Sequence, residues 1–393
     1  MQILDKRAAM RIPPLLRLGF RPFFLLGGLL AALVIPLWLL ALHGMTGQPL
    51  GGWLAWHRHE MLFGFAGAII AGFLLTAVQT WTGRPGLSGR PLAALVLVWL
   101  LARLAWWTPW PLLLLAANLA FLAGVALVMA RMLLAVRQRR NYPIVVVLLL
   151  LLGADLLTLA GVLGQNDAWQ RQGVWAAVWL VAAIMGLIGG RVIPFFTQRG
   201  LGRVTAVQPW AWLDWALLVG TAVLALLHAA GFALVPRPWL GLGFAALALG
   251  HLVRLCRWFD AGLLRVPLLW SLHLAYAWLV LACAGMALWH FGLLPGVSPA
   301  LHALTVGAMA GLILAMLARV SLGHTGRPLE LPRGFALAFA MLNLAAALRV
   351  FAVELWYWPS LWLAVVCWCL AFGQFLVCYG PMLCRGRVDG HPG

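Results

Sequence analysis

The amino-acid sequence predicts an all-α polytopic membrane protein that crosses a lipid bilayer about twelve times. Of its 393 residues, 64% are hydrophobic and only 9% are charged, whereas a soluble domain carries roughly 25% charged residues. Apolar runs recur along the whole chain and only short polar loops separate them; a helix needs about 20 apolar residues to cross the hydrocarbon core. A chain this poor in charge cannot cover its own surface in water, so the lipid bilayer is its expected solvent.

The predicted helices leave no room for a soluble domain, so we expect a single transmembrane domain over residues 1–393. The basic N-terminal segment leads into an apolar run that is longer than a signal-peptide core and has no small-residue cleavage site, so the first helix should be retained. The expected helices span residues 18–43, 57–81, 91–108, 110–136, 143–165, 172–197, 209–231, 238–258, 266–290, 298–323, 335–356 and 359–383.

The basic residues of the loops predict the orientation. Arginine and lysine gather in the N-terminal segment, the even-numbered loops and the C-terminal tail, while the odd-numbered loops hold only Arg171 and Arg237. Basic loops stay in the cytoplasm, so both termini are expected there. The net charge of +18 suggests nucleic acid as a partner, but the arginines form no single basic face, and we expect no nucleic-acid binding.

An internal repeat relates helices 2–3 (57–108) to helices 10–11 (298–356) at a constant offset of 243 residues. His59 then meets His302, and Thr-Gly-Arg-Pro at 82–85 meets the same tetrapeptide at 325–328. A weaker copy in helices 6–7 (172–231) has Val174 at the histidine position. Three copies in one orientation predict three parallel four-helix units. The alternative is that loop-end Arg-Pro pairs coincide because basic residues belong in cytoplasmic loops.

Histidine is the residue type most indicative of chemistry here, because neutral imidazole binds metals and haem without a permanent charge in the membrane. The predicted helices arrange the histidines in two layers, which suits two metal centres. The alternative for His228, His251 and His290 is interhelical hydrogen bonding. The outer layer holds His57, His59, His228, His290 and His302, and the inner layer holds His251, His273 and His324.

The segment Trp56–Met61 is the richest in polar groups. His57 and His59 diverge by about 200° on a regular helix, so they cannot bind one metal together. Glu60 shares a face with His57 and can orient its ring. Alternatively, Glu60 can pair with an arginine, and Arg103 is the candidate. The alternative partner of Arg103 is a haem propionate. Among acids, only Glu60 and Glu354 are expected near the outer histidines, and Asp155 and Asp214 are expected elsewhere. Few acidic side chains are therefore available to form a proton route.

The repeat suggests one haem site in the outer half of the membrane. His59 and His302 lie at equivalent positions on helices that run the same way, and they are the expected axial ligands of one haem. The rival is that His57 is the ligand. Arg58, Arg103 and Arg349 are the candidates for pairing with the propionates.

Toward the cytoplasmic side, His273 and His324 are expected to contribute to a second metal or haem site, against the alternative of a structural hydrogen bond and a loop contact. No CxxCH, P-loop or HExxH motif occurs, so a haem would be bound non-covalently; the sequence does not determine the haem type, and a b-type haem is the expectation. The six cysteines lie in or at the ends of apolar runs, and we expect them to act as small hydrophobic residues.

Several motifs together resemble the NnrS family of bacterial membrane proteins, which is tied to the nitric-oxide response. They are LGFRPFF at 18–24, WHRHEM at 56–61, GGRVIP at 189–194 and RVSLGHTGRPL at 319–329. The resemblance implies about twelve helices, bound haem and copper, protection against nitrosative stress and a place in the bacterial inner membrane. The family residues that it carries over are His57, His59, Glu60, His273, His302 and His324.

The predicted arrangement also looks like the haem–copper oxidase subunit, in which helices 2 and 10 supply low-spin haem ligands. This sequence has only His228 near the end of helix 7, where that superfamily has paired histidines, so a shared binuclear centre is not expected.

The leading functional hypothesis is a haem- and copper-binding protein that acts on nitric oxide or its adducts, in its enzyme form an oxidoreductase fed by a membrane electron donor. The alternative is a non-enzymatic haem-dependent sensor, carrier or transporter of nitric oxide. An ordinary secondary transporter would place its substrate groups near mid-membrane, whereas the histidines here are predicted off-centre.

The loop charges make the topology testable. Reporter fusions should place the segments 44–56, 166–170 and 292–297 outside the cytoplasm and the segments 84–90 and 327–333 inside it, because basic loops resist translocation. A cytoplasmic signal from a reporter in 44–56 would overturn the orientation and the two histidine layers deduced from it.

Overall fold

The computed structural model describes residues 6–205 and 207–391 and confirms the all-helical architecture; this part of the chain contains no strand. The first five residues of the basic N-terminal segment lie outside the described residues. Within the described residues, ten helices are long and apolar enough to cross a membrane. The shorter helical stretches Gly89–Ala105 and Ala336–Ala352 complete the predicted set of about twelve.

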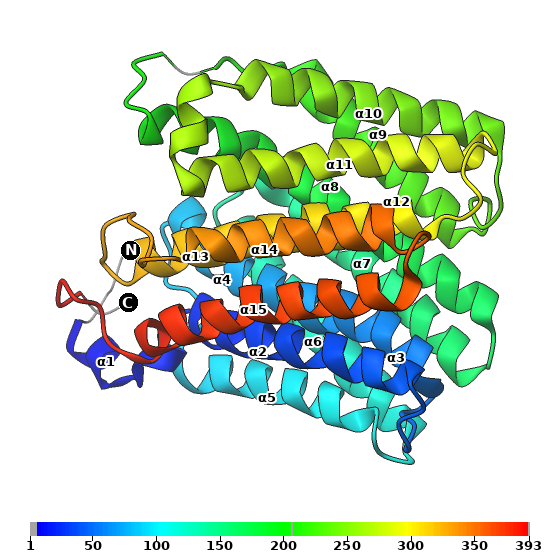
Figure 1. Cartoon of the computed structure of the whole chain (residues 1–393). Coiled ribbons are helices and arrows are strands. Elements are labelled where there is room, and N and C mark those ends of the chain that lie inside the picture. Colours follow the sequence, from blue (N-terminus) through cyan, green and yellow to red (C-terminus); the bar gives the residue numbers. More distant parts are fainter. Residues whose placement is uncertain (1–5, 206, 392–393) are drawn as a thin grey trace. The chain divides into compact units, whose positions relative to one another are not determined.

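The chain divides into two compact units, each taken here by itself. Unit 1 contains residues 1–170, 317–332 and 372–393. In it, α2 packs against α4, and α6 packs against α4, α5 and α7, as the blue and cyan ribbons show (Figure 1). Its helices are α1 (Lys6–Arg11), α2 (Phe20–Leu42), α3 (Gly52–His59), η2 (Glu60–Ala66), α4 (Gly67–Thr82), α5 (Gly89–Ala105), α6 (Pro111–Ala135) and α7 (Tyr142–Leu163), with the short 3₁₀ turns η1 (Pro14–Leu16) and η3 (Arg139–Asn141).

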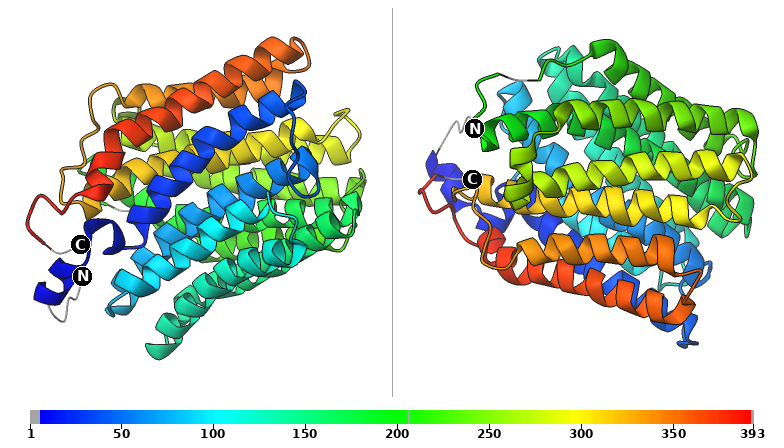
Figure 2. Two further views of the ribbon diagram at one scale, coloured as in Figure 1. Left: turned by 90° about the horizontal axis from the view of Figure 1, so that it is seen from below. Right: turned by 45° about the horizontal axis from the view of Figure 1, so that its top comes forward.

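Unit 2 contains residues 171–316 and 333–371. Here α11 packs against α10, η5 and α14, and α9, α10 and α11 run side by side from green to yellow (Figure 2). Its helices are most of α8 (Asp167–Gly200), then α9 (Ala211–Ala229), α10 (Pro238–Trp258), η4 (Ala261–Arg265), α11 (Pro267–His290), α12 (Ser298–His302), η5 (Ala303–Ala310), α14 (Ala336–Ala347) and η6 (Leu348–Ala352). Both α13 (Gly311–His324) and α15 (Tyr357–Cys384) pass from unit 2 into unit 1.

Proline and glycine explain several helix ends. α6, α10 and α11 each begin at a proline, whose missing N–H is not needed in the first helical turn. α4 ends at Gly83 with a φ of 66°, a left-handed conformation that favours glycine. Predicted helix 2 starts earlier than expected, at Gly52 rather than residue 57.

Large apolar side chains on the helix surfaces fit a lipid environment. Leu97 is 64% exposed and Leu112 is 76% exposed. Such faces would aggregate in water, whereas in a bilayer they meet hydrocarbon. The exposed leucine, valine and tryptophan side chains therefore support the membrane assignment.

The two strong repeat copies share local structure as well as sequence. Thr82 Oγ1 donates to Val78 O at 2.7 Å and Thr325 Oγ1 donates to Ser321 O at 2.7 Å. Each threonine is followed by a glycine with positive φ, Gly83 at 66° and Gly326 at 77°. The weaker copy has Thr197 at the equivalent position, and its hydroxyl donates to Ile193 O. No left-handed glycine follows, because α8 continues to Gly200 without a break.

A further shared feature was not predicted: each repeat histidine directly precedes a π-helix. His59 is followed by η2 and His302 by η5. π-Helical turns are rare and occur frequently at functional sites. The glycines at equivalent positions, Gly64 and Gly307, are both tightly packed: Trp99 Nε1 donates to Gly64 O at 3.1 Å, and a Cβ at Gly307 would lie 2.4 Å from the Trp278 ring.

This packing predicts that Gly307→Ala destabilises the protein. The added methyl would overlap the buried indole of Trp278, and overpacking of this kind costs about 1–3 kcal/mol. Gly153→Ala is the control, because a Cβ on that helical glycine meets nothing within 4 Å. Thermal unfolding in detergent should show a lower Tm for Gly307→Ala only; equal Tm values for the two variants would contradict the packing.

Candidate functional site

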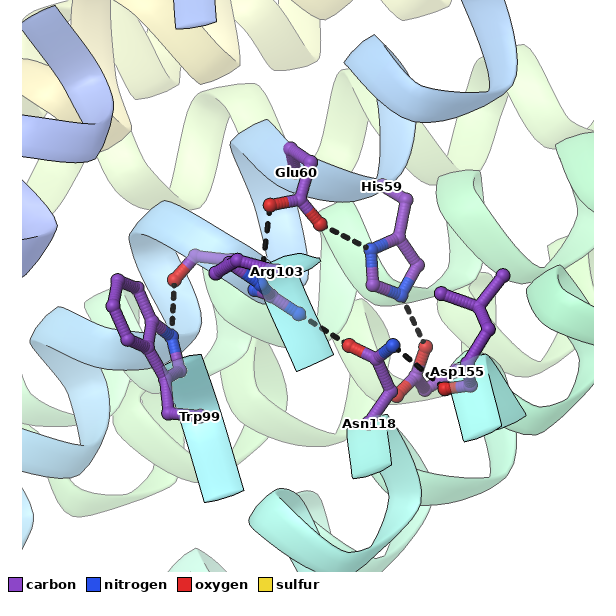
Figure 3. A network of polar contacts seen from close by, with 8 residues as sticks. His59, Glu60, Trp99, Arg103, Asn118 and Asp155 are labelled. Carbon is purple, nitrogen blue, oxygen red and sulfur yellow. Dashed lines mark hydrogen bonds and ion pairs between the residues drawn. The ribbon is translucent and has the colours of Figure 1, made fainter. Parts of the chain in front are cut away.

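The first repeat histidine, His59, is at the centre of a buried polar network in unit 1. Its ring is fully buried, and both ring nitrogens face carboxylates. Nδ1 lies 3.1 Å from Glu60 Oε1 and Nε2 lies 2.8 Å from Asp155 Oδ1, as drawn in Figure 3. A neutral imidazole has one N–H, so two acceptor carboxylates require a further proton, on the ring or on one carboxyl group.

The network continues from Glu60 to α5 and α6. Arg103 Nε lies 3.1 Å from Glu60 Oε2, which confirms Arg103 as the arginine partner of Glu60. The Arg103 guanidinium also donates to Asn118 Oδ1, and Asn118 Nδ2 donates to Leu114 O at 2.8 Å. Figure 3 shows the side chains of this chain of contacts converging from separate helices.

The charges of this network balance. With His59 as imidazolium, it and Arg103 supply two positive charges, and Glu60 and Asp155 supply two negative ones. All four side chains are buried, with Arg103 the most exposed at 9%. Buried charges are tolerated only when they are paired and hydrogen-bonded, and each of these has an opposite charge in contact.

Small and aromatic residues make room for the network and keep water away from it. A Cβ at Gly64 would lie 2.6 Å from Arg103 Nη1 and 2.9 Å from Glu60 Oε2, so the π-helix needs glycine at this position. The rings of Phe63 and Trp106 lie 4.9 and 5.0 Å from the His59 ring. A low-dielectric wall of this kind strengthens the ion pairs inside it.

Asp155 was expected to lie away from the outer histidines, and this prediction was wrong. Asp155 lies past the middle of α7, and its carboxylate contacts His59. The signal was present in the sequence: a lone acid inside a membrane span is expected to find a partner in the bundle interior, and in the predicted topology α7 runs outward from a basic loop. The acids at the outer layer are therefore more numerous than expected.

The segment that holds His57 and Arg58 also differs from expectation. Glu60 was expected to orient His57, but the ring against its carboxylate is that of His59. His57 stacks on Trp38, with centroids 4.7 Å apart and 14° between the planes. Arg58 donates to Asp167 Oδ1 at 2.7 Å and to Gln170 Oε1 at 2.8 Å, so its head group is engaged by the protein.

The second repeat histidine, His302, lies in unit 2 with a different set of partners. Its Nδ1 lies 2.8 Å from Ser298 O, and Arg349 Nη2 donates to Ser298 Oγ at 2.9 Å. Both sites thus combine a histidine before a π-helix with an arginine from a later helical segment, Arg103 on α5 and Arg349 on η6. The carboxylates of the His59 site have no counterpart in these contacts.

The remaining intramembrane histidines make structural contacts. His251 Nδ1 lies 2.6 Å from Tyr276 Oη, an interhelical hydrogen bond, and His290 Nδ1 accepts from Arg237 N at 3.2 Å. His228 Nδ1 bonds within its own helix, to Leu224 O at 2.7 Å. The interhelical alternative is therefore confirmed for His251, and His290 accepts from the residue just before α10.

The two inner-layer histidines belong to different units, and their pairing stays a prediction. His273 Nδ1 lies 3.0 Å from Leu269 O and its Nε2 lies 3.4 Å from Trp258 O. The ring of His324 lies 5.5 Å from that of Phe20. Across residues 6–205 and 207–391, no three histidine, cysteine, aspartate or glutamate side chains gather as a metal site.

The His59 network should be a main source of stability for unit 1. Asp155→Asn removes one negative charge and leaves the buried cations uncompensated, so we expect a loss of about 3–5 kcal/mol and a lower Tm in detergent. Asp260→Asn is the matched control: Asp260 pairs with Arg203 at 2.8 Å on the surface, where the hydrogen bonds from Arg203 lower the pKa of Asp260. This exposed pair should contribute nothing measurable. An unchanged Tm for Asp155→Asn would contradict the network's role.

The comparisons with known proteins agree with the sequence motifs. No curated protein matches the chain in a sequence search. The model of the family described as NnrS protein matches residues 14–387, which include both repeat histidines and every residue of the His59 network. This chain belongs to the NnrS family of membrane proteins.

Proposed function

We propose that this protein binds haem and copper in the bacterial inner membrane and acts on nitric oxide or its adducts during nitrosative stress. Its membership in the NnrS family supports a role in the nitric-oxide response. The observation that carries the finer proposal is the pair of repeat-equivalent histidines, each set at the start of a π-helix with an arginine nearby.

His302 has the arrangement that suits a haem or metal ligand. Its Nδ1 lies 2.8 Å from Ser298 O, which favours the proton on Nδ1 and the lone pair on Nε2. Histidine ligands usually have the second ring nitrogen held by a carbonyl or carboxylate in this way. Ser298 also connects the site to Arg349 through its hydroxyl, so a cation stands near the ligand.

His59 fits the same role if one contact opens. Glu60 would keep Nδ1 oriented, which is the carboxylate–histidine–metal arrangement, and Nε2 would exchange Asp155 for iron. The Asp155 carboxylate, at 2.8 Å from Nε2, would then be released to accept a proton from the network. Arg103 is already paired with Glu60 and Arg58 with Asp167, so the propionate role proposed for the arginines is left mainly to Arg349.

Bound haem would supply a one-electron redox centre, and copper a soft site for a small ligand. The protein's own groups would orient the histidines, exclude water with the rings of Phe63 and Trp106, and hold a proton among His59, Glu60 and Asp155. The Asp155 carboxylate beside His59 supports the enzyme form, which needs a proton route and an electron donor in the membrane.

A sensor, carrier or transporter remains the second candidate, and one feature favours it. A haem held by both His59 and His302 has no open coordination position, so nitric oxide could bind it only by displacing a histidine. Turnover would then need the second centre proposed at His273 and His324. Consumption of nitric oxide by purified protein kept reduced with an excess of chemical reductant separates the two, because only an enzyme consumes more than one equivalent of nitric oxide per haem.

The pairing of His59 with His302 is tested by His59→Ala and His302→Ala, each purified and examined by optical and EPR spectroscopy. Each variant should lose the same low-spin haem signal, because loss of either axial ligand changes the spin state. His251→Ala is the control, since His251 hydrogen-bonds Tyr276, and it should keep the signal.

If His59→Ala retains the low-spin signal and His57→Ala loses it, His57 is the ligand and the pairing is wrong. The same preparations address the inner layer: His273→Ala and His324→Ala should lower the total metal or haem content while the outer signal persists. Full content in both would end the second-site proposal.

A further inference from the structure

One end of unit 1 gathers more positive charge than its acids can balance. The start of α2, the end of α13 and the C-terminal tail meet there: Arg387 Nη1 donates to His324 O at 3.2 Å, and Val388 N donates to Thr325 O at 3.2 Å. The loop arginines place this end at the cytoplasmic surface in the predicted topology. None of the roles proposed for the outer histidines uses these residues.

Arg21 is at the centre of this end and is 0% exposed. Its Nη1 donates to Leu383 O at 2.9 Å and to Arg385 O at 2.6 Å, which fixes the plane of the guanidinium. Its Nε and Nη2 are buried and have no hydrogen-bond partner. These two groups form one edge of the guanidinium, the edge that grips two oxygens of a carboxylate or phosphate side by side.

Neighbouring cations add to the imbalance. Arg17, Arg327 and Arg387 all act electrostatically on Arg21, and Nη1 of Arg327 is also buried without a hydrogen-bond partner. Of these four arginines, only Arg387 forms an ion pair with an acid in the described part of the chain, and that acid is Asp389.

Both carboxylate oxygens of Asp389 accept hydrogen bonds from Arg387. Arg387 Nε and Nη2 donate to its two oxygens at 2.9 and 2.5 Å, and these bonds lower the pKa of Asp389. The left-handed Gly326 makes room for this carboxylate, because a Cβ there would lie 2.8 Å from it. Asp389 therefore neutralises Arg387, and within residues 6–205 and 207–391 neither Arg21 nor Arg327 forms an ion pair with an acid.

A buried, unpaired guanidinium such as that of Arg21 is strongly unfavourable. Its two orphaned donors and the buried Nη1 of the half-buried Arg327 indicate a ligand that supplies the missing charge. We propose that this end of unit 1 binds a phosphate group, with two oxygens on the Nε–Nη2 edge of Arg21 and the remaining charge facing Arg327. The phosphate belongs either to an anionic lipid headgroup at the cytoplasmic surface or to a soluble phosphate.

Two arms of one experiment distinguish these sources in the purified full-length protein. The first titrates inorganic phosphate against the protein in neutral detergent at constant ionic strength with chloride, which holds screening fixed. The second compares nanodiscs of phosphatidylcholine with and without phosphatidylglycerol. Thermal unfolding is the readout in both, because a ligand that binds the folded state raises Tm.

Phosphate or phosphatidylglycerol should raise the Tm of the natural protein, and Arg327→Gln should weaken the apparent affinity roughly tenfold, the loss of a charged hydrogen bond. Arg21→Lys keeps the charge but loses the two-donor edge, so it should weaken the apparent affinity as much as Arg327→Gln does. If Arg21→Lys fails to fold because the tail loses its contacts, the Arg327→Gln variant still tests the proposed phosphate site. Arg139→Gln, an exposed loop arginine of the same unit, is the control and should bind normally.

A response to phosphate in detergent assigns the site to a soluble phosphate, and a response only to phosphatidylglycerol assigns it to a lipid headgroup. Either outcome supports the proposal when the Arg327→Gln variant loses the response. The proposal is overturned if neither probe raises Tm, or if Arg139→Gln weakens the response as much as Arg327→Gln does.

Discussion

The need to neutralise every charge that enters the membrane governs the interior of unit 1. His59 and Glu60 come from one helical span, Arg103 from α5 and Asp155 from α7, and their side chains meet at distances of 2.8–3.1 Å. Removing any one partner would leave an uncompensated charge in low dielectric, where pairing decides stability. The same constraint explains Gly64, whose missing side chain leaves room for the Arg103 guanidinium.

The two repeat copies apply one local design to different chemistry. Both have a histidine, a π-helix and a glycine packed closely by a neighbouring side chain, yet His59 is surrounded by carboxylates and His302 by the backbone and hydroxyl oxygens of Ser298. A π-helical turn shifts the phase of the side chains that follow it. Divergence after duplication would leave one site able to hold a proton and the other poised as a neutral ligand.

Much of this could be predicted from the sequence because membrane spans and basic loops obey strong rules. The helices, the repeat and the Glu60–Arg103 pair follow from hydropathy, loop arginines and helical spacing. The contact of Asp155 with His59 was missed, because sequence spacing relates residues on one helix and does not say which helices meet. The π-helices were missed as well: a turn with one extra residue leaves no clear mark in an apolar run such as 303–310.

The central claim is that this NnrS protein uses its intramembrane histidines to hold haem and copper. Metal and haem analysis of the purified wild-type protein, with an optical spectrum before and after reduction, tests it most directly. We expect a Soret band with the α and β bands of low-spin haem on reduction, together with stoichiometric copper. Protein purified from cells supplied with iron and copper that shows no Soret band and no bound copper would contradict it.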